Sequence, residues 1–88
     1  MTLLDVRERT EYEGERLPNA MQLPLSELES RAKELARYLK RPVIAFGGRG
    51  TTTRVATQAL AKHGFGEIFV LKGGVRAWKD AGLPVERA

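Results

Sequence analysis

The sequence predicts an α/β protein, a three-layer α/β/α sandwich around a mostly parallel central sheet of about four strands. Three observations support this class. Short apolar runs of strand length alternate along the chain with amphipathic segments of helical period. The runs are largely apolar on both faces, as strands inside a parallel sheet are. Right-handed crossovers between neighbouring parallel strands then place helices on both faces of the sheet.

The first quarter of the chain predicts two strands separated by a charged segment. Residues 3–6 predict a short inner strand. The charged segment 7–15 follows, with one helical turn around residues 10–13. Pro24 limits the apolar stretch 21–23 to a short or edge strand, because proline cannot donate a ladder hydrogen bond.

A helix and a buried strand are expected next. Ser26 and Glu29 have the spacing of a capping box, and the apolar residues that follow recur at helical period up to Lys40. Pro42 ends this helix, and the continuous apolar run 43–46 predicts a buried central strand.

A glycine-rich turn then leads into a second helix. The turn spans residues 47–50, with Thr51 or Thr52 as the expected N-cap, and His63 and Gly64 close the helix. The residues expected to face the core are Val55, Ala56, Ala59 and Leu60.

The last part of the chain predicts one more strand and helix. Residues 68–71 form the strand, residues 73–74 a turn, and residues 75–81 a short helix that Gly82 and Pro84 terminate.

Length and charge place the chain in a broad class. Its 88 residues are enough for one domain, which we expect to span residues 1–88. The net charge of +4 comes from scattered arginines and lysines, which indicates a mild preference for anions but not for nucleic acid. No apolar run is long enough to cross a membrane, so we expect no membrane association and a cytoplasmic location. Scarce asparagine and glutamine suggest heat adaptation.

The absence of cysteine excludes more chemistry than any other feature of the composition. Zero cysteines rule out disulfides, thiolate metal sites, persulfide carriers and cysteine nucleophiles within these residues. With one histidine and no carboxylate cluster at ligand spacing, we expect neither a metal nor a cofactor.

Four segments of the chain contain short sequence motifs. They are Leu-Asp-Val-Arg-Glu at residues 4–8 with Tyr12; residues 17–25; the strand, loop and helix at 43–56; and Gly-Gly-Val-Arg-Ala-Trp at 73–78 with residues 82–85. Taken together, these segments resemble the rhodanese-like domain family over essentially the whole chain. The resemblance implies the α/β/α fold and places the family's active-site loop directly after the strand 43–46.

Two departures from the family pattern matter. The family usually begins with an extra strand and helix, so the chain resembles a shortened, single-domain member. Active members place a nucleophilic cysteine directly after the central strand and often an arginine at the sixth loop position. This sequence has Gly47 and Thr52 at those two positions, and Arg16 stands where the resemblance puts the family's histidine.

The missing thiol predicts a catalytically inactive domain. In the family's reaction a cysteine thiolate attacks the outer sulfur of a donor such as thiosulfate and passes it on as a persulfide. Gly47 has no side chain, and a threonine hydroxyl is a poor nucleophile without an adjacent base. The alternative is sulfurtransferase or phosphatase-like activity that uses a threonine or a nucleophile supplied by a partner.

The candidate site is therefore a loop that binds through its backbone. Several N–H groups converging at a helix N-terminus favour an anion, and Arg16 and Arg54 could flank it. The candidate anion-binding residues are Gly47, Gly48, Arg49, Gly50, Thr51 and Thr52. The expected partner is a small anion such as sulfate, phosphate or a thiosulfate-like molecule, or another protein. The other interpretation is an inherited loop shape whose glycines serve only backbone positions with positive φ.

Structural roles are expected for the other conspicuous side chains. Asp5 and Arg7 predict an ion pair or backbone hydrogen bonds at the end of a buried strand. Trp78 is expected to pack in the core, and His63 to contact terminal carbonyls and solvent. A solvated acidic face is expected for Glu8, Glu11, Glu13 and Glu15. The glycine-rich turn lacks the further glycine, acidic residue or lysine that dinucleotide and P-loop sites need.

Overall fold

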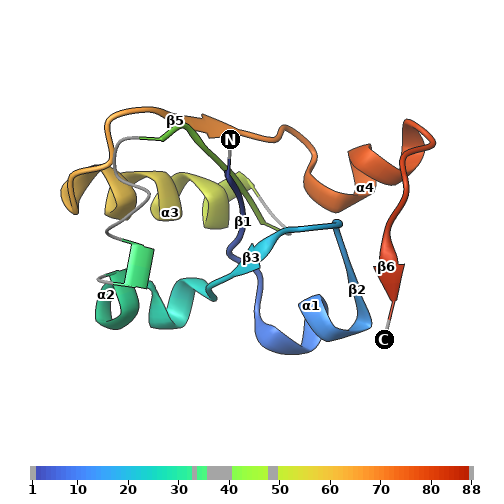
Figure 1. The fold of residues 1–88 in the computed structure, drawn as a ribbon, viewed down its shortest axis with the longest axis horizontal. Helices are drawn as coiled ribbons and strands as arrows, with labels where there is room; N and C mark the ends of the chain where they lie inside the picture. Colours follow the sequence, from blue (N-terminus) through green and yellow to red (C-terminus); the bar gives the residue numbers. More distant parts are fainter. Residues whose placement is uncertain (1, 33, 36–40, 48–49, 88) are drawn as a thin grey trace.

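The central sheet has the predicted α/β arrangement. The computed structural model describes residues 2–32, 34–35, 41–47 and 50–87 (Figure 1). Four strands lie in the order β3-β1-β4-β5, and each pairs in parallel with its neighbour. The strands are β1 (Thr2–Asp5), β3 (Met21–Gln22), β4 (Val43–Phe46) and β5 (Ile68–Val70). The inner position of β4 and the edge position of β3 are both as predicted.

Helices cover both faces of this sheet, which gives the three layers. On one face α3 (Gly50–Lys62) and α2 (Leu28–Arg31) pack on the larger core cluster. On the other face α4 (Gly74–Asp80) packs on a smaller cluster. The buried residues of the α3-side cluster are Leu4, Val6, Leu23, Leu28, Leu35, Val43, Ala45, Ala56, Leu60 and Phe65. Those of the α4-side cluster are Leu17, Phe46 and Val75.

The charged segment after β1 forms more structure than the sequence predicted. The expected helical turn is present as α1 (Arg9–Gly14). It leads into β2 (Glu15–Arg16), which pairs antiparallel with β6 (Glu86–Arg87) near the C-terminal end. This two-stranded ribbon lies beside α4 in Figure 1 and was not predicted.

The helix start predicted at Ser26 is wrong. A 3-10 turn, η1 (Leu25–Glu27), comes first, and α2 begins at Leu28 without a side-chain cap. The Leu25 N–H donates to the carbonyl of Val6, the residue after β1 (3.0 Å), so the chain is still bonded to the segment beside it where a cap would form. The Ser26 hydroxyl instead donates to the Glu8 carboxylate at 2.9 Å. Residues 33 and 36–40 of the predicted helix lie outside the described residues.

The start of α3 also differs from the prediction. The helix already begins at Gly50, so neither Thr51 nor Thr52 is its N-cap. Val55 is 49% exposed and does not face the core, whereas Ala56 and Leu60 are fully buried as expected. The buried stripe starts one helical turn earlier, at Thr53, because residues spaced by three and four share one face. Gly64, with φ of 98°, ends the helix region as predicted.

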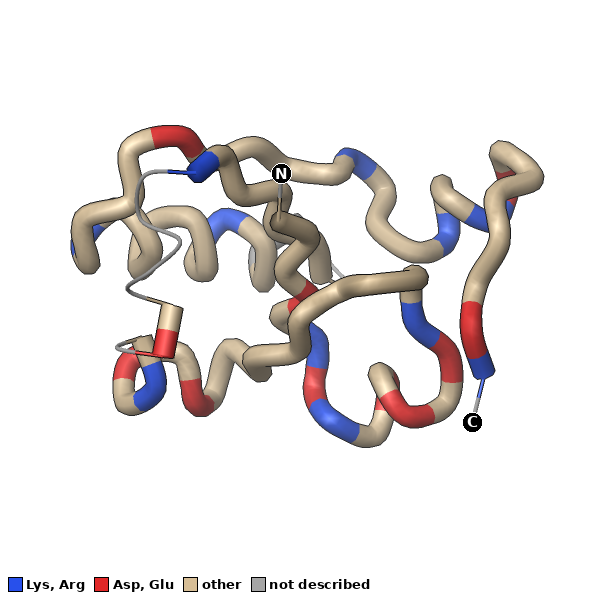
Figure 2. Tube along the Cα trace, in the orientation of Figure 1, with Lys and Arg blue, Asp and Glu red and all other residues tan. Residues whose placement is uncertain are grey.

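No helix in the described part of the chain is both long and apolar enough to span a bilayer. Figure 2 shows lysines and arginines spread along the chain rather than gathered in one segment.

Candidate functional site

Gly47 lies at the carboxyl edge of the sheet, directly after β4. The Val6 N–H donates to the Phe46 carbonyl at 3.0 Å, so Gly47 sits beside the residue that follows β1. A Cβ atom at position 47 would lie 3.2 Å from the Thr53 hydroxyl, 3.3 Å from the Thr52 methyl and 3.4 Å from a Val6 methyl. Gly47 does not have positive φ. The interpretation that its backbone requires glycine is therefore wrong for this position.

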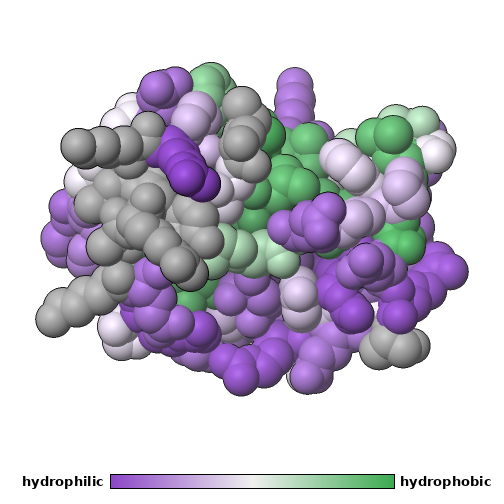
Figure 3. All heavy atoms as spheres, viewed as in Figure 1, coloured by the Kyte–Doolittle hydropathy of each residue, from purple (hydrophilic) through white to green (hydrophobic). Residues whose placement is uncertain are grey.

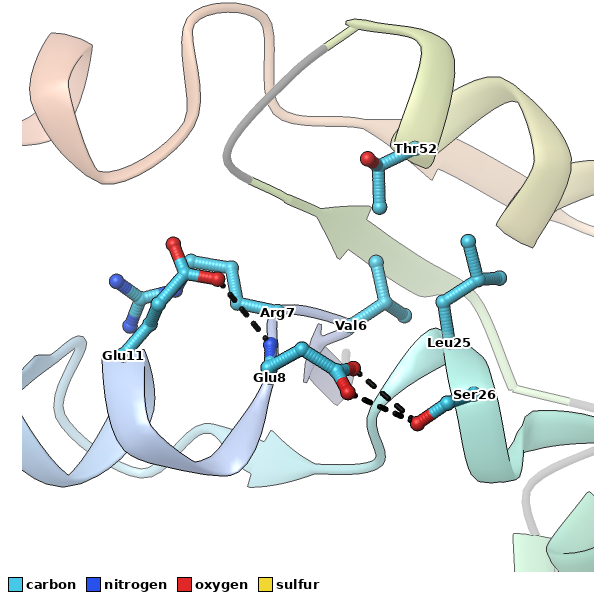
Figure 4. A pocket seen from close by; sticks show the side chains of 7 residues that line it. All are labelled: Val6, Arg7, Glu8, Glu11, Leu25, Ser26 and Thr52. Atoms are coloured by element: carbon cyan, nitrogen blue, oxygen red, sulfur yellow. Dashed lines mark hydrogen bonds between the residues drawn. The ribbon is translucent and has the colours of Figure 1, made fainter.

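A cleft of about 610 Å³ lies next to Val6 and Thr52 (Figure 4). The cleft is bounded by the end of β1, by α1, by η1 and by the first turns of α3. Its lining residues are Val6, Arg7, Glu8, Glu11, Leu25, Ser26 and Thr52. Val6 and Thr52 are also the neighbours of a Cβ at position 47, so a side chain placed there would border the cleft.

The turn before α4 packs directly on Gly47. Gly74 has φ of 58°, and a Cβ there would lie 2.5 Å from the Gly47 carbonyl oxygen. Only glycine allows the two backbones to approach this closely. The Gly73-Gly74 pair thus has a packing role that supports the start of the candidate loop.

Arg7 lines the cleft and forms a buried ion pair with Asp5. The Arg7 Nη2 atom lies 2.8 Å from Asp5 Oδ2, and the Arg7 backbone N–H donates to Asp5 Oδ1 at 2.9 Å. Asp5 is fully buried and Arg7 is 8% exposed. Arg7 also donates to the Glu15 carbonyl at 2.6 Å. The predicted ion pair is confirmed, and Asp5 neutralises the Arg7 charge.

Glu8 and Glu11 line the cleft from α1. The Glu8 carboxylate accepts a hydrogen bond from Ser26, and Glu11 Oε1 accepts one from the Glu8 backbone N–H at 3.4 Å. Neither carboxylate forms an ion pair with a residue that the structure describes. Two carboxylates without an ion pair among the described residues therefore line the cleft. This lining role was not predicted from the sequence, where the acidic run indicated a solvated face only.

The predicted loop residues differ in where they lie relative to the cleft. Thr52 lines the cleft, and Gly50 and Thr51 lie in the first turn of α3. Gly48 and Arg49 lie outside the described residues.

The two predicted flanking arginines do not line the cleft. Arg16 lies in β2, with Nε 3.6 Å from Glu86 Oε1 and its guanidinium 5.3 Å from the centre of the Tyr12 ring. Arg54 is exposed on α3 and has no ion pair with a described residue.

Trp78 and His63 each form a side-chain contact away from the cleft. Trp78 packs on the α4-side cluster as predicted, and its Nε1 donates to the Pro84 carbonyl. His63 Nε2 lies 2.9 Å from Glu29 Oε2, a contact between α3 and α2 that the sequence did not indicate. The His63 hydrogen bond lowers the pKa of Glu29 below its ordinary value.

The described part of the chain contains no group of three or more His, Cys, Asp or Glu side chains that could hold a metal ion.

Comparison with known proteins identifies the family. The model of the rhodanese-like domain matches residues 1–81. The chain belongs to the rhodanese-like domain family. Relatives of this rhodanese-like domain include the uncharacterized protein YibN of Escherichia coli K12, 33% identical over 86 residues. That match covers 97% of the chain and 60% of YibN.

Two further matches connect the domain to sulfurtransferases and to a solved structure. The thiosulfate sulfurtransferase GlpE of Coxiella burnetii is 29% identical, covering 90% of the chain and 72% of GlpE. A crystal structure of the Alr3790 protein from Anabaena sp. superposes with a TM-score of 0.91 at 34% identity. The match covers 99% of the chain and 77% of the crystallised chain. The domain is thus related to sulfurtransferases but contains no cysteine.

Proposed function

We propose that this rhodanese-like domain has no sulfurtransferase activity of its own and binds a small anion at residues 47–52. One observation carries the proposal: Gly47 occupies the position beside the cleft where the resemblance to the family places the nucleophilic cysteine. The sequence contains no other thiol to replace it.

The hydroxyl groups near the cleft do not replace the thiol. Thr52 lines the cleft, but a threonine nucleophile needs an adjacent base. The single histidine, His63, is eleven residues further on, about 16 Å along the helix axis at 1.5 Å per residue. His63 lies just after the C-terminal end of α3, where its Nε2 atom contacts Glu29 of α2.

Anion binding is supported by the start of α3. This helix is 13 residues long and begins at Gly50, so its free N–H groups and its dipole favour negative charge beside the cleft. Glu8 and Glu11 oppose this preference, and Arg7 is already neutralised by Asp5. The ligand is therefore a small anion held by main-chain donors, and we expect weak binding.

The activity half of the proposal is tested with thiosulfate and cyanide. The purified 88-residue chain should form no thiocyanate above the buffer rate. Turnover by the chain alone would refute catalytic silence. The same assay with an added low-molecular-weight thiol tests the alternative of a supplied nucleophile, which predicts turnover only with the thiol present.

A Gly47→Cys substitution tests whether the site keeps the geometry needed for catalysis. The new Cβ requires Thr52 and Thr53 to move by a few tenths of an ångström, and no positive φ opposes it. Next to the start of α3 the thiol should have a pKa below about 8.5 and should accept sulfur from thiosulfate. Gly47→Ser is the matched control and should stay inactive. An unperturbed, unreactive thiol would show that the site does not stabilise negative charge.

Anion binding is tested by NMR titration with sulfate and thiosulfate at constant ionic strength. The backbone amides of residues 47–53 should shift in a saturable way. A Glu11→Gln variant removes one opposing charge but keeps a side chain that can cap α1, so it should bind the anion several-fold more tightly. Amides that do not respond would refute the anion site without affecting the result of the activity assay.

A further inference from the structure

A second pocket lies between β2 and α4 and shares Arg7 with the cleft. Its volume is about 460 Å³, within the range of small-molecule sites in proteins. In Figure 4 the guanidinium end of Arg7 points away from Val6 and Thr52, so Arg7 reaches this pocket from the side opposite to the cleft. The residues that line the pocket are Arg7, Glu15, Val75, Arg76, Lys79 and Asp80.

Arg7 keeps two unused N–H donors. Of the five N–H groups of its guanidinium, Nε donates to both Asp5 carboxylate oxygens at 3.1 Å, and Nη2 donates to Asp5 Oδ2 and to the Glu15 carbonyl. No described residue accepts a hydrogen bond from Nη1. Within the described part of the chain every fully buried side-chain nitrogen has a partner, so Nη1 reaches open space. Because Arg7 is 8% exposed, a bound acceptor would satisfy these donors in a largely dehydrated setting.

Two exposed cations of α4 border the same pocket. Arg76 and Lys79 are three residues apart and therefore share one face of the helix. The Arg76 Nε atom lies 3.9 Å from Asp80 Oδ2, and these side chains are 89% and 72% exposed, so the pair is loose and contributes little. The Lys79 Nζ atom lies 3.1 Å from Glu15 Oε1, and Glu15 also pairs with Arg87 at 2.9 Å. Glu15 thus shares its one negative charge between two cations.

The charges around the pocket favour an anion. Three cations and two carboxylates line it, which leaves one positive charge in excess. Two further charges lie just behind the lining and cancel each other, Asp5 and Arg87. Figure 3 shows hydrophilic residues gathered over α1, β2 and β6, next to α4. These surroundings suit a charged ligand, and Val75 supplies one small apolar wall.

We propose that the pocket between β2 and α4 binds the phosphate group of a small molecule. Arg7 Nη1 donates its two free N–H groups to phosphate oxygens, and Arg76 turns from Asp80 toward the same group. Lys79 adds a third positive charge. A phosphate offers more acceptors and more charge than a carboxylate, which the fork of a single guanidinium already satisfies. The remaining volume leaves room for an organic body beside Val75.

The first test is an NMR titration of the 88-residue chain with inorganic phosphate and with propyl phosphate, at neutral pH and constant ionic strength. The backbone amides of residues 75–80 and the Arg7 side-chain N–H signals should shift in a saturable way. Acetate should bind at least about threefold more weakly. Propyl phosphate binds more tightly than inorganic phosphate if the ligand is an ester, and no more tightly if it is the free ion; both results support the proposal.

Two results of this titration would overturn the proposal. One is an absence of saturable shifts at residues 75–80, and the other is acetate binding as tightly as phosphate. The amides of residues 47–53 report the separate anion site proposed above. Shifts confined to residues 47–53 would therefore sink this inference alone, and shifts confined to residues 75–80 would sink only the other proposal.

Variants of α4 distinguish a defined site from general attraction to a positively charged chain. Arg76→Gln should weaken phosphate binding about threefold or more. Lys72→Gln is the matched control, because it removes the same charge from an exposed residue that does not line the pocket, and it should leave the affinity almost unchanged. Asp80→Asn removes a carboxylate from the pocket and releases Arg76, so it should bind phosphate about threefold more tightly.

The three substituted side chains are exposed, so the variants should remain folded, which their amide spectra check. Equal losses in Arg76→Gln and Lys72→Gln would overturn the proposal, since general charge would then explain the binding. A failure of Asp80→Asn to bind more tightly would do the same.

Discussion

Arg7 connects three parts of the molecule through one buried guanidinium. It pairs with Asp5 at the end of β1, donates to the Glu15 carbonyl in β2, and lines the cleft. Arg7→Leu leaves the fully buried Asp5 carboxylate without its counter-charge, and removal of one partner of a buried pair typically destabilises a protein by about 3–5 kcal/mol. Urea denaturation measures this loss.

Arg9 is the matched control for this prediction. Its ion pair with Glu27 spans 3.2 Å, but the two side chains are 57% and 37% exposed. Exposed pairs contribute at most about 1 kcal/mol, so Arg9→Leu should leave the free energy of unfolding almost unchanged. Equal losses in the two variants would mean that burial of the Asp5–Arg7 pair does not determine its contribution.

A substitution at Gly74 should also destabilise the folded protein. Gly74→Ala introduces a Cβ at a positive φ and 2.5 Å from the Gly47 carbonyl oxygen. The backbone conformation alone costs about 1–3 kcal/mol, and the clash adds to it. Gly66→Ala is the control, because it has no positive φ and no atom within 4 Å of its Cβ, and it should change stability by less than about 1 kcal/mol. Thermal unfolding that shifts equally in both variants would contradict the proposed contact.

Some residue roles could be predicted from the sequence, and others could not. The Asp5–Arg7 pair was predictable, because an acid and a base two positions apart end a buried strand. The contact of His63 with Glu29 was not, because it joins residues 34 positions apart. The backbone conformation of Gly47 was misjudged, since a glycine after a strand can equally mark a position that any residue could adopt.

At the scale of elements, the predictions succeeded where one periodic pattern spans a whole element. The strands around residues 4, 44 and 69 and the helix after residue 50 were found in this way. The 3-10 turn η1 was missed because its hydrogen bond to Val6 depends on the neighbouring strand, which no local pattern records. The two-residue strands β2 and β6 are too short to show any period.

The ribbon of β2 and β6 should be sensitive to pH through Glu15. Hydrogen bonds from Lys79, which has the larger effect, and from Arg87 lower the pKa of Glu15 below its ordinary value of 4.5. A carboxyl group with a lowered pKa in the folded state stabilises that state above the ordinary pKa, and this stabilisation is lost as the pH falls through the folded value. The β6 segment should therefore detach as the pH is lowered below 4.5, which the amide signals of Glu86 and Arg87 report by NMR.

A Glu15→Gln variant isolates this effect. Glutamine keeps the size of the side chain but does not titrate, so the β6 amides should show weaker docking at neutral pH and little further change on acidification. If the variant keeps the acid transition of the wild type, another carboxyl group controls the ribbon. Glu86, which lies 3.6 Å from Arg16, is the first to examine.

At the scale of the whole molecule, the two faces of the sheet are unequally stabilised. Among the described residues the α3-side cluster has ten buried members, from β1, α2, β4, α3 and their connections, whereas the α4-side cluster has three, Leu17, Phe46 and Val75. Buried apolar contact is the main source of local stability. The unit made of α4 and β6 should consequently open more easily than the strands and helix on the other side.

Native-state hydrogen exchange at increasing urea tests this asymmetry. The amides of α4 should exchange through a partial opening with a lower free energy than the amides of β1, β4 and α3. Val75→Ala should reduce only the opening free energy of α4, whereas Leu60→Ala, which truncates a fully buried residue of the other cluster, should reduce the global free energy by about 2–5 kcal/mol. Exchange of α4 only through global unfolding would show one cooperative unit. Because Gly74 packs on Gly47, a partial opening of α4 would also uncover the start of the candidate loop, and bound anion should then slow the exchange of α4.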